Sequence, residues 1–401
     1  MKVLSIFGTR PEAIKMCPLV AALAQAPDIE SVVCTTGQHR SMLDQVMDTF
    51  GVRSDHALDV MQPGQSLNAM VARLLVALDP VLESVRPDRV LVHGDTTTAL
   101  AGALVAFQRR VPIGHVEAGL RTGDLAAPFP EEMNRRVVDS MSDLMFAPTE
   151  GARRHLRAEG LTGRIVVTGN TVIDALQQAA RRIDGDAALR AELDRPFGFL
   201  HPARRMVLVT GHRRENFGEG FAGICEALAT LAARREDIDI VYPVHLNPQV
   251  DGPVREALGR SPRIHLIAPQ SYLPFVRLMQ RAHLVLTDSG GVQEEAPALG
   301  KPVLVMRDVT ERPEAVAAGT ARLVGTHPRR IVAAVDALLD DPALHHGFSR
   351  VRNPYGDGRA CARIVAALQG LPVEPFPPPS GRGEPAPAPA ATTEAELQCP
   401  A

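Results

Sequence analysis

Short apolar runs alternate with helical patterns along most of the chain, and this alternation is the strongest constraint on its fold. In the first half, runs such as Lys2–Phe7 and Arg89–His93 are separated by segments with apolar residues at helical spacing. Strand-sized runs without polar alternation are typical of a parallel sheet covered by helices on both faces. The other strands expected in this half are Ser31–Thr35, Val111–Val116, Asp143–Ala147 and Ile165–Val167.

The same pattern restarts after a polar stretch at 194–205. The strands expected in the second half are Met206–Thr210, Ile238–Val244, Ile264–Ala268, Leu284–Asp288, Val303–Met306 and Ala321–Val324. At 401 residues, the chain exceeds the size at which a single core usually stops growing. We therefore expect two doubly wound sheets joined near residue 172. Their ligand should bind in the cleft between them, beyond the carboxyl ends of the strands.

Composition narrows the class of protein. The charge is 43 basic against 46 acidic residues, a net −3, and the absence of a long basic run argues against a nucleic-acid partner. The five cysteines are widely spaced and contain no C-x-x-C, so neither a disulfide framework nor a metal site is expected. The opening residues do not resemble a signal peptide, and no segment is long and apolar enough to span a membrane. We expect a soluble cytoplasmic protein.

The last residues differ sharply in composition from the rest. A helix is expected at Arg359–Leu368, and periodicity does not tell which domain it joins. After Leu371 the chain is rich in proline and alanine with few apolar anchors. Residues 372–401 are therefore predicted to be a disordered tail without a catalytic role.

Polar side chains gather where the expected strands of the first half end. Arg10 follows Lys2–Phe7 at the positive end of a helix dipole, an unfavourable place for a cation unless an anion lies there, and Lys15 is one turn further on. Asp95 is well placed as a helix N-cap. Glu117 has no capping role that the sequence assigns, so it is the stronger functional candidate. Glu131 begins another helix, where it could merely complement the dipole.

The second half ends its strands in the same way. The stretch after Leu284–Asp288 reads Ser289-Gly290-Gly291 and opens a helix, whose free N–H groups attract anions such as phosphate. An ordinary turn with Ser289 as the cap is the alternative reading. His212 follows Met206–Thr210, and Arg312 lies beyond Val303–Met306. No G-x-G-x-x-G or G-x-x-x-x-G-K-[ST] motif is found, so neither a nicotinamide cofactor nor a P-loop ATPase is supported.

Several long strings resemble those of the non-hydrolysing UDP-N-acetylglucosamine 2-epimerases of bacteria. They occur in one order from residue 1 to about 371, and they are FGTRPEAIKMCPL, LVHGDTTTAL, GHVEAGLRTGD, PFPEEMNRR, VTGHRRENFG, YPVHLNP, LTDSGGVQEEAPALGKPVLVMRD, TERPEA and NPYGDGRA. The resemblance implies the GT-B architecture of two Rossmann-like domains, here 1–171 with 355–371, and 172–354. It also implies interconversion of UDP-GlcNAc and UDP-ManNAc by elimination of UDP to 2-acetamidoglucal and re-addition, without a cofactor or metal.

By resemblance, the catalytic residues are Asp95, Glu117, Glu131 and His212. Glu117 and Glu131 would be the acids and bases at C2, Asp95 would stabilise positive charge or orient substrate, and His212 would meet the diphosphate. The remaining substrate contacts implied are Arg10, Lys15, Gln270, Phe275, Ser289, Gly290, Gly291, Glu295 and Arg312. Ser289–Gly291 would hold the diphosphate, Glu295 the ribose, and Gln270 with Phe275 the uracil.

Some bacterial members have a second UDP-GlcNAc site used for activation. Gln38, Arg214 and His245 match its polar pattern, whereas Ser41 and Gly64 depart from it. The resemblance further implies a homodimer and a role in cell-envelope polysaccharide synthesis. The alternatives are a GT-B glycosyltransferase, which would need only one base, a hydrolysing epimerase that releases free ManNAc, and a non-catalytic nucleotide-sugar sensor.

Overall fold

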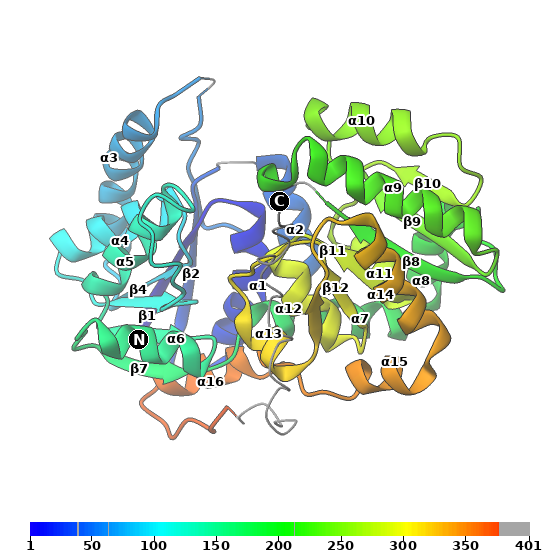
Figure 1. Ribbon diagram of the computed structural model, residues 1–401. Helices are drawn as coiled ribbons and strands as arrows, with labels where there is room; N and C mark the ends of the chain where they lie inside the picture. Colours follow the sequence, from blue (N-terminus) through cyan, green and yellow to red (C-terminus); the bar gives the residue numbers. More distant parts are fainter. Residues whose placement is uncertain (38–39, 63, 212, 377–401) are drawn as a thin grey trace, which may run out of the picture.

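Two α/β lobes lie side by side, each built on one parallel sheet (Figure 1). The computed structural model describes residues 1–37, 40–62, 64–211 and 213–376. The N-terminal sheet has the strand order β3-β2-β1-β4-β5-β6-β7, and the C-terminal sheet has the order β10-β9-β8-β11-β12-β13. The predicted fold class, two doubly wound parallel sheets in a GT-B-like arrangement, is confirmed.

The strands of the N-terminal lobe are close to those predicted, with one addition, the short β3. Their bounds are β1 Lys2–Phe7, β2 Glu30–Thr35, β3 His56–Ala57, β4 Arg89–His93, β5 Ile113–Val116, β6 Leu144–Ala147 and β7 Arg164–Val167. Strand β5 begins two residues later than predicted because the Val111 N–H donates to the Ala106 carbonyl at the end of the preceding helix (2.9 Å). The helices are α1 Arg10–Gln25, α2 Arg40–Phe50, α3 Leu67–Val85, α4 Thr97–Gln108, α5 Glu131–Met141 and α6 Glu150–Ala158.

The C-terminal lobe repeats this design around a fully buried central strand. Its strands are β8 Arg205–Thr210, β9 Ile238–Pro243, β10 Ile264–Ile267, β11 Ala282–Thr287, β12 Val303–Val305 and β13 Ala321–Leu323. Leu284, Val285 and Leu286 of β11 are wholly buried, as expected for a strand covered on both faces. The helices are α9 Glu219–Arg234, α10 Pro248–Leu258, α11 Tyr272–Arg281, α12 Gly290–Ala298, α13 Pro313–Ala318, α14 Pro328–Asp340 and α15 Pro342–Ser349, with short 3-10 turns at Arg195–Phe197 and Arg214–Asn216.

Strand order and register bring the polar strand ends together. In each sheet the order reverses beside the first strand, between β1 and β4 and between β8 and β11, and ligands of such sheets bind at these reversals. His93 of β4 pairs with Val116 of β5, so Gly94 and Glu117 follow at one level. Thr210 of β8 pairs with Thr287 of β11 in the same way. The polar clusters after these strands therefore flank both reversals.

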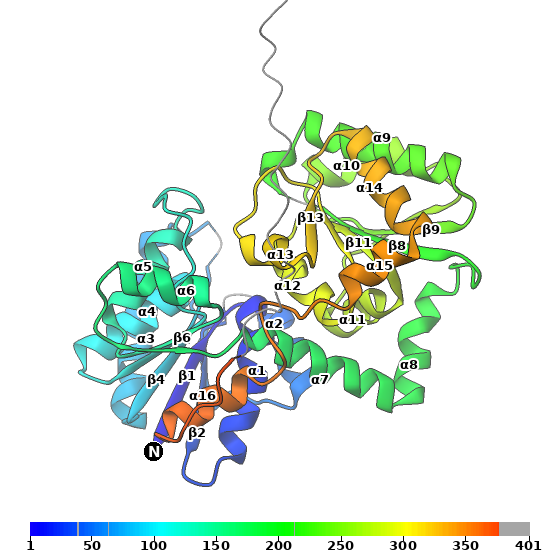
Figure 2. The ribbon, with the colours of Figure 1, turned by 60° about the horizontal axis from the view of Figure 1, so that its bottom comes forward.

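Two helices join the lobes. Helix α7 (Thr171–Gly185), which continues into α8 (Ala187–Asp194), contacts α1 of one lobe and α11 and α12 of the other. The last helix, α16 (Ala360–Leu368), returns to contact α1 and α7 (Figure 2). Ahead of it, the Tyr355 carbonyl accepts the Asn170 N–H (2.6 Å). The two chain segments that cross between the lobes, near 170 and 355, are thus hydrogen-bonded to each other.

Most of the predicted disordered tail lies outside the described residues, which end at 376. Of its first residues, Glu374 accepts a hydrogen bond at its carbonyl from Arg363 Nε of α16 (3.0 Å). Within the described part of the chain, no helix is long and apolar enough to cross a membrane.

We predict that α16 is integral to the N-terminal lobe's stability. Ile364 is wholly buried in the main core, and its replacement by alanine should lower the free energy of unfolding by about 2–5 kcal/mol. Leu371→Ala is the control, because Leu371 is 52% exposed and its loss should change stability by less than about 0.5 kcal/mol. Urea denaturation followed by circular dichroism measures both. Equal midpoints for the two variants would contradict the role of α16.

Candidate active site

Glu117 lies at the centre of the interface between the lobes. It follows β5 with φ of +68°, a left-handed conformation that costs a residue with a side chain roughly 1–3 kcal/mol. Its side chain is only 7% exposed. One carboxylate oxygen accepts from Lys15 Nζ of α1 and from Asn170 Nδ2 (2.8 Å). Strain of this kind is maintained only where the surroundings fix the residue, and it is frequent at functional sites.

Lys15 sets the charge of this carboxylate. Burial would raise the pKa of Glu117, but the neighbouring cationic groups, with Lys15 first among them, together outweigh burial, and the pKa lies well below its usual range. The pKa of Lys15 is raised, since the attraction of Glu117 and Glu294 outweighs its own desolvation. His93 Nε2 lies 3.6 Å from the other Glu117 oxygen. Burial lowers the pKa of His93 to about 3 despite this carboxylate, so the imidazole is neutral at pH 7.

A buried chain of polar groups supports the loops that carry Asp95 and Glu117. His115 of β5 lies with Nδ1 2.6 Å from Asp139 and Nε2 2.8 Å from the Gly94 carbonyl oxygen. Asp139 also accepts from the Gly119 N–H (3.3 Å) and pairs with Arg121 (2.7 Å). The chain therefore ties the backbone on both sides of Glu117 to α5.

Gly94 needs its hydrogen side chain at this point. Its φ is +64°, and a Cβ there would lie 3.3 Å from a Glu117 oxygen. The loop after β4 consequently passes close to the Glu117 carboxylate at Gly94, and Asp95 is the next residue in this loop.

Asp95 is not the helix cap that the sequence suggested. Thr96 caps α4 instead, accepting the Ala99 N–H at Oγ1 (3.0 Å). The Asp95 carboxylate is left to pair with Arg135 of α5, and its carbonyl accepts from Asn134 Nδ2 (2.8 Å). The Asp95 carboxylate is therefore held by Arg135 and not by the helix end, and its side chain remains 27% exposed.

Of the two glutamates that begin α5, Glu132 has the structural role. It is wholly buried and accepts the Thr122 N–H (3.1 Å) and the Gly123 N–H (3.3 Å), which fixes the loop after β5. Glu131 is half-buried at the first position of the helix, so its carboxylate is the less constrained of the pair.

Arg10 bridges the two lobes. Thr9 and Glu12 form a reciprocal capping box at the start of α1, and Glu12 also accepts from Thr96 Oγ1 (2.7 Å). This fixes the turn that carries Arg10, whose guanidinium donates to the Gln270 carbonyl of the other lobe (3.2 Å). Desolvation lowers the pKa of Arg10, and the Glu295 carboxylate opposes that shift.

The turn from β11 into α12 is surrounded by charged side chains. Ser289 occupies the N-cap position, and within the described residues its side chain makes no cap hydrogen bond. A Cβ on Gly290 would lie 3.0 Å from a Glu311 oxygen and 3.4 Å from Arg213 Nη2, so only glycine fits without displacing them. Arg213 and Glu311 pair at 2.8 Å. The start of α12 therefore faces the guanidinium groups of Arg213 and Arg312 together with the Glu311 carboxylate that pairs with Arg213.

The glutamates Glu294 and Glu295 of α12 differ in their environment. Glu294 is buried, pairs with Arg312, and accepts from Asn170 Nδ2 (2.7 Å). Burial raises the pKa of Glu295 to about 7, with the charge of Glu294 adding to the shift and Lys15 and Arg10 opposing it. Burial lowers the pKa of Arg312, but Glu294 and Glu117 outweigh it and keep the guanidinium charged.

The remaining candidates lie around this centre or outside the described residues. Gln270 Nε2 donates to the Ala268 carbonyl (2.7 Å), and Phe275 is partly buried against the main core. His212, Gln38 and the Arg214 side chain are outside the described part of the structure. Of the candidate regulatory residues this leaves His245, which is exposed and accepts the Asn247 N–H at Nδ1 (3.1 Å).

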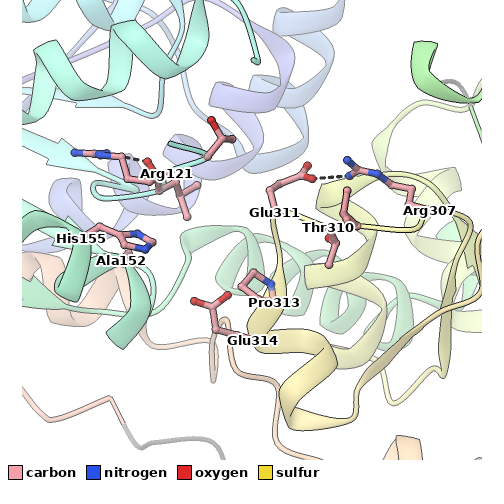
Figure 3. Close-up of a pocket in the computed structure, with 11 residues that line it drawn as sticks. Arg121, Ala152, His155, Arg307, Thr310, Glu311, Pro313 and Glu314 are labelled. Atoms are coloured by element: carbon pink, nitrogen blue, oxygen red, sulfur yellow. Dashed lines mark hydrogen bonds and ion pairs between the residues drawn. The ribbon is translucent and has the colours of Figure 1, made fainter. Parts of the chain in front are cut away.

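A cavity of about 400 Å³ lies between the lobes beside this centre (Figure 3). Arg121, Ala152 and His155 line it from one lobe, and Arg307, Thr310, Glu311, Pro313 and Glu314 from the other, with Leu120, Thr122 and Val309 completing the walls. None of the residues predicted from sequence lines it. The cavity adjoins the predicted residues through Glu311, which contacts the start of α12. The space between the lobes therefore extends beyond the predicted residues.

The sequence reasoning missed Asn170, Glu294 and the His115–Asp139 pair. Asn170 follows a predicted strand, β7, and the strand-end rule applied to the other clusters would have found it. Glu294 is adjacent to the predicted Glu295, and only the helix register shows which of the two turns inward. Among the described residues, no group of three or more His, Cys, Asp and Glu side chains could hold a metal ion.

Comparisons with known proteins agree on one family. The model of the UDP-N-acetylglucosamine 2-epimerase family matches residues 21–369. UDP-N-acetylglucosamine 2-epimerases of Salmonella typhimurium and Escherichia coli are each 57% identical over 370 residues, which is 92% of this chain and 98% of each relative. The crystal structure of the Neisseria meningitidis UDP-GlcNAc 2-epimerase bound to UDP-GlcNAc superposes with a TM-score of 0.87 at 47% identity, over 92% of this chain and 100% of that one.

We predict that Lys15→Met leaves a buried, uncompensated carboxylate and lowers the free energy of unfolding at pH 7 by about 3–5 kcal/mol. The loss should shrink as the pH falls. In the wild type the folded-state pKa of Glu117 is lower than the unfolded-state pKa, so this residue stabilises the fold at pH values above the unfolded-state pKa and loses that contribution as the pH falls. In the variant Glu117 gains a proton on folding, so acid relieves the penalty. Urea denaturation at pH 7 and pH 5 measures both effects.

A Glu117→Gln background provides the control for this experiment. Without the carboxylate, Lys15→Met should cost much less, because no charge is left unpaired. An equal cost in both backgrounds would contradict the pairing of Lys15 with Glu117.

Proposed function

The chain belongs to the UDP-N-acetylglucosamine 2-epimerase family, and we propose that it inverts C2 of UDP-GlcNAc to give UDP-ManNAc, reversibly. The observation that carries the proposal is the position of Glu117, a strained and buried carboxylate that shares the Asn170 amide with Glu294 of α12 in the other lobe. A glycosyltransferase would share the turn of α12, whereas acidic groups at three neighbouring strand and helix ends favour chemistry at C1 and C2 of the sugar.

We propose elimination and re-addition as the route. The C2 proton is not acidic enough for direct removal, so the C1–O bond breaks, UDP leaves, and a base takes the C2 proton to give 2-acetamidoglucal. UDP then returns to C1 while a proton is delivered to the other face of C2. Glu117 and Glu131 serve as the acids and bases at C2, and Asp95 stabilises the positive charge that develops at C1.

In this route Lys15 controls the basicity of Glu117. While Lys15 is paired with Glu117, the carboxylate is a weak base, because its pKa is held low. A diphosphate that enters the site competes with Glu117 for the Lys15 ammonium group. If Lys15 pairs with the phosphate instead, the basicity of Glu117 rises when substrate is present. Lys15 thereby acts as a substrate contact and as a restraint on the base.

The C-terminal lobe holds the nucleotide in this proposal. The backbone N–H groups of Ser289–Gly291 bind the diphosphate, with Arg10, Arg312 and His212 neutralising its charge. Glu295 accepts the ribose hydroxyls, and Gln270 with Phe275 contacts uracil. Closure of the lobes around the site keeps the glycal and UDP from escaping.

The wider setting follows from family membership. We propose a division into domains at 1–171 with 355–371 and at 172–354, a homodimer, a cytoplasmic location and a role in cell-envelope polysaccharide synthesis. Second-site activation by UDP-GlcNAc through Gln38, Arg214 and His245 is part of the same proposal.

Proton NMR of the reaction in D2O tests the proposed activity. With UDP-GlcNAc as substrate, we expect UDP-ManNAc to appear and deuterium to replace hydrogen at C2 of both sugars, with only traces of glycal and free UDP. Free ManNAc in amounts equal to UDP would indicate a hydrolysing epimerase. Retention of the C2 proton in the product would overturn the elimination route, and no reaction without an added acceptor would favour a glycosyltransferase.

Glu117→Gln tests the assigned base. Loss of the carboxylate should reduce C2 exchange roughly 1,000-fold, the scale of general base catalysis, while UDP binding measured by calorimetry is at least as tight as in the wild type, because the carboxylate no longer holds Lys15. Glu150→Gln on α6 is the matched control, since Glu150 lies on the surface paired with Arg153, and it should exchange at the wild-type rate. Wild-type exchange in Glu117→Gln would exclude Glu117 as a base.

A further inference from the structure

Asn170 occupies a position that none of the proposed roles explains. It is 2% exposed, at the junction of β7 and α7 where the chain leaves the N-terminal lobe. Its Oδ1 accepts the Val172 N–H (3.1 Å) and caps α7, and its backbone N–H donates to Tyr355 (2.6 Å). Both bonds fix the side chain, with the Nδ2 group directed into the interface between the lobes.

The Nδ2 group donates to one carboxylate of each lobe. It lies 2.8 Å from Glu117 Oε1 and 2.7 Å from Glu294 Oε2. The orientation of the amide is not arbitrary, because a rotated amide would place its oxygen against two carboxylates and its NH₂ against the N–H of α7. One neutral donor group thus holds two acidic side chains that would otherwise repel each other.

Glu294 connects this contact to the nucleotide turn. It lies in the second turn of α12, four residues after Gly290, and is held by Arg312. Its backbone carbonyl accepts from Asn353 Nδ2 (2.7 Å), next to the residue pair that joins the lobes. A movement of α12 relative to the N-terminal lobe must therefore stretch or break the Asn170 bonds.

We propose that Asn170 is a positioning residue for the epimerase reaction, holding Glu117 in register with α12 so that the base and the leaving nucleotide stay aligned. This inference rests on the proposed function and assigns it a residue that couples the two lobes. Asn170 contacts no reacting atom in this role. It acts through the angle and distance of the Glu117 carboxylate, where errors of about 1 Å can cost about 100-fold in rate.

Asn170→Asp is the decisive variant. Aspartate keeps the cap of α7 and the shape of the side chain, but it replaces the shared donor with a third carboxylate. We expect kcat to fall about 100-fold while KM and the affinity for UDP stay within threefold. The acid limb of kcat/KM should move to higher pH, because Glu117 loses a donor and gains a negative neighbour. The charge of Glu294 adds to this shift, the charges of Lys15 and Arg312 oppose it, and His93 is neutral.

A purely structural role would give a different result. If Asn170 only caps α7, Asn170→Asp should retain wild-type kcat and pH profile, and that outcome overturns the proposal. Asn170→Ser keeps a capping oxygen but cannot reach the carboxylates, so it should lose kcat like the aspartate variant. Circular dichroism and thermal melting confirm that each variant is folded.

A double-mutant cycle with Glu294 tests the coupling between lobes. Glu294→Gln supplies an amide that can donate to the carboxylate introduced by Asn170→Asp, so the double variant should recover at least tenfold in kcat over Asn170→Asp alone. The same cycle measured on unfolding needs no turnover and should show the two sites to be non-additive. Additive effects in both measurements would overturn the coupling.

An inactive wild type would overturn the proposed function, whereas an active wild type with an unaffected Asn170→Asp variant would overturn only the role of Asn170.

Discussion

The buried ion pair between Lys15 and Glu117 is the interaction on which the site depends. A carboxylate taken out of water is stable only if charge and hydrogen bonds compensate it, and Glu117 receives both, from Lys15 and from Asn170. The pair joins α1 to the end of β5, and its position requires the left-handed backbone of Glu117. The fold thus stabilises a costly conformation by surrounding it with fixed partners.

The same interaction extends across the cleft through alternating charges. Lys15, Glu117, Asn170, Glu294 and Arg312 form a continuous chain from α1 to the loop after β12. Each acidic member of this chain is held by one cation and by the neutral Asn170 donor. The chain gives the two lobes a defined register. It also places Lys15, the proposed diphosphate contact, beside the proposed base.

Sequence reasoning was sufficient for the fold because the apolar runs are unambiguous. A strand such as Leu284–Thr287, buried on both faces, has few alternatives, and the repeated alternation with helices leaves only parallel sheets. The two-residue β3 was missed because His56 and Ala57 carry no strand signal. The gathering of polar side chains was predictable in outline, since residues after neighbouring parallel strands must meet at one edge of the sheet.

The pairings of side chains within the site could not be predicted from the sequence. Asp95 seemed the natural cap of α4, but Thr96 takes that role, and the choice depends on backbone angles that composition does not reveal. The contact of Lys15 with Glu117 joins residues 102 apart, and that of Asn170 with Glu294 joins residues 124 apart. Neither has a local pattern, since the first arises from the way α1 packs beside the end of β5 and the second from the way α7 and α12 meet.

Lys15 keeps Glu117 ionised in the free protein, and the role of the site depends on this charge. Carbon-13 NMR of glutamate-labelled protein can test it directly, with the Glu117 carboxyl signal assigned by its loss in Glu117→Gln. Between pH 7 and pH 4 we expect the shift of an ionised carboxylate throughout, because the Glu117 pKa lies well below its usual range. A titration at or above the ordinary glutamate value of 4.5 would show that the ion pair does not hold the charge, and it would contradict the role given to Lys15.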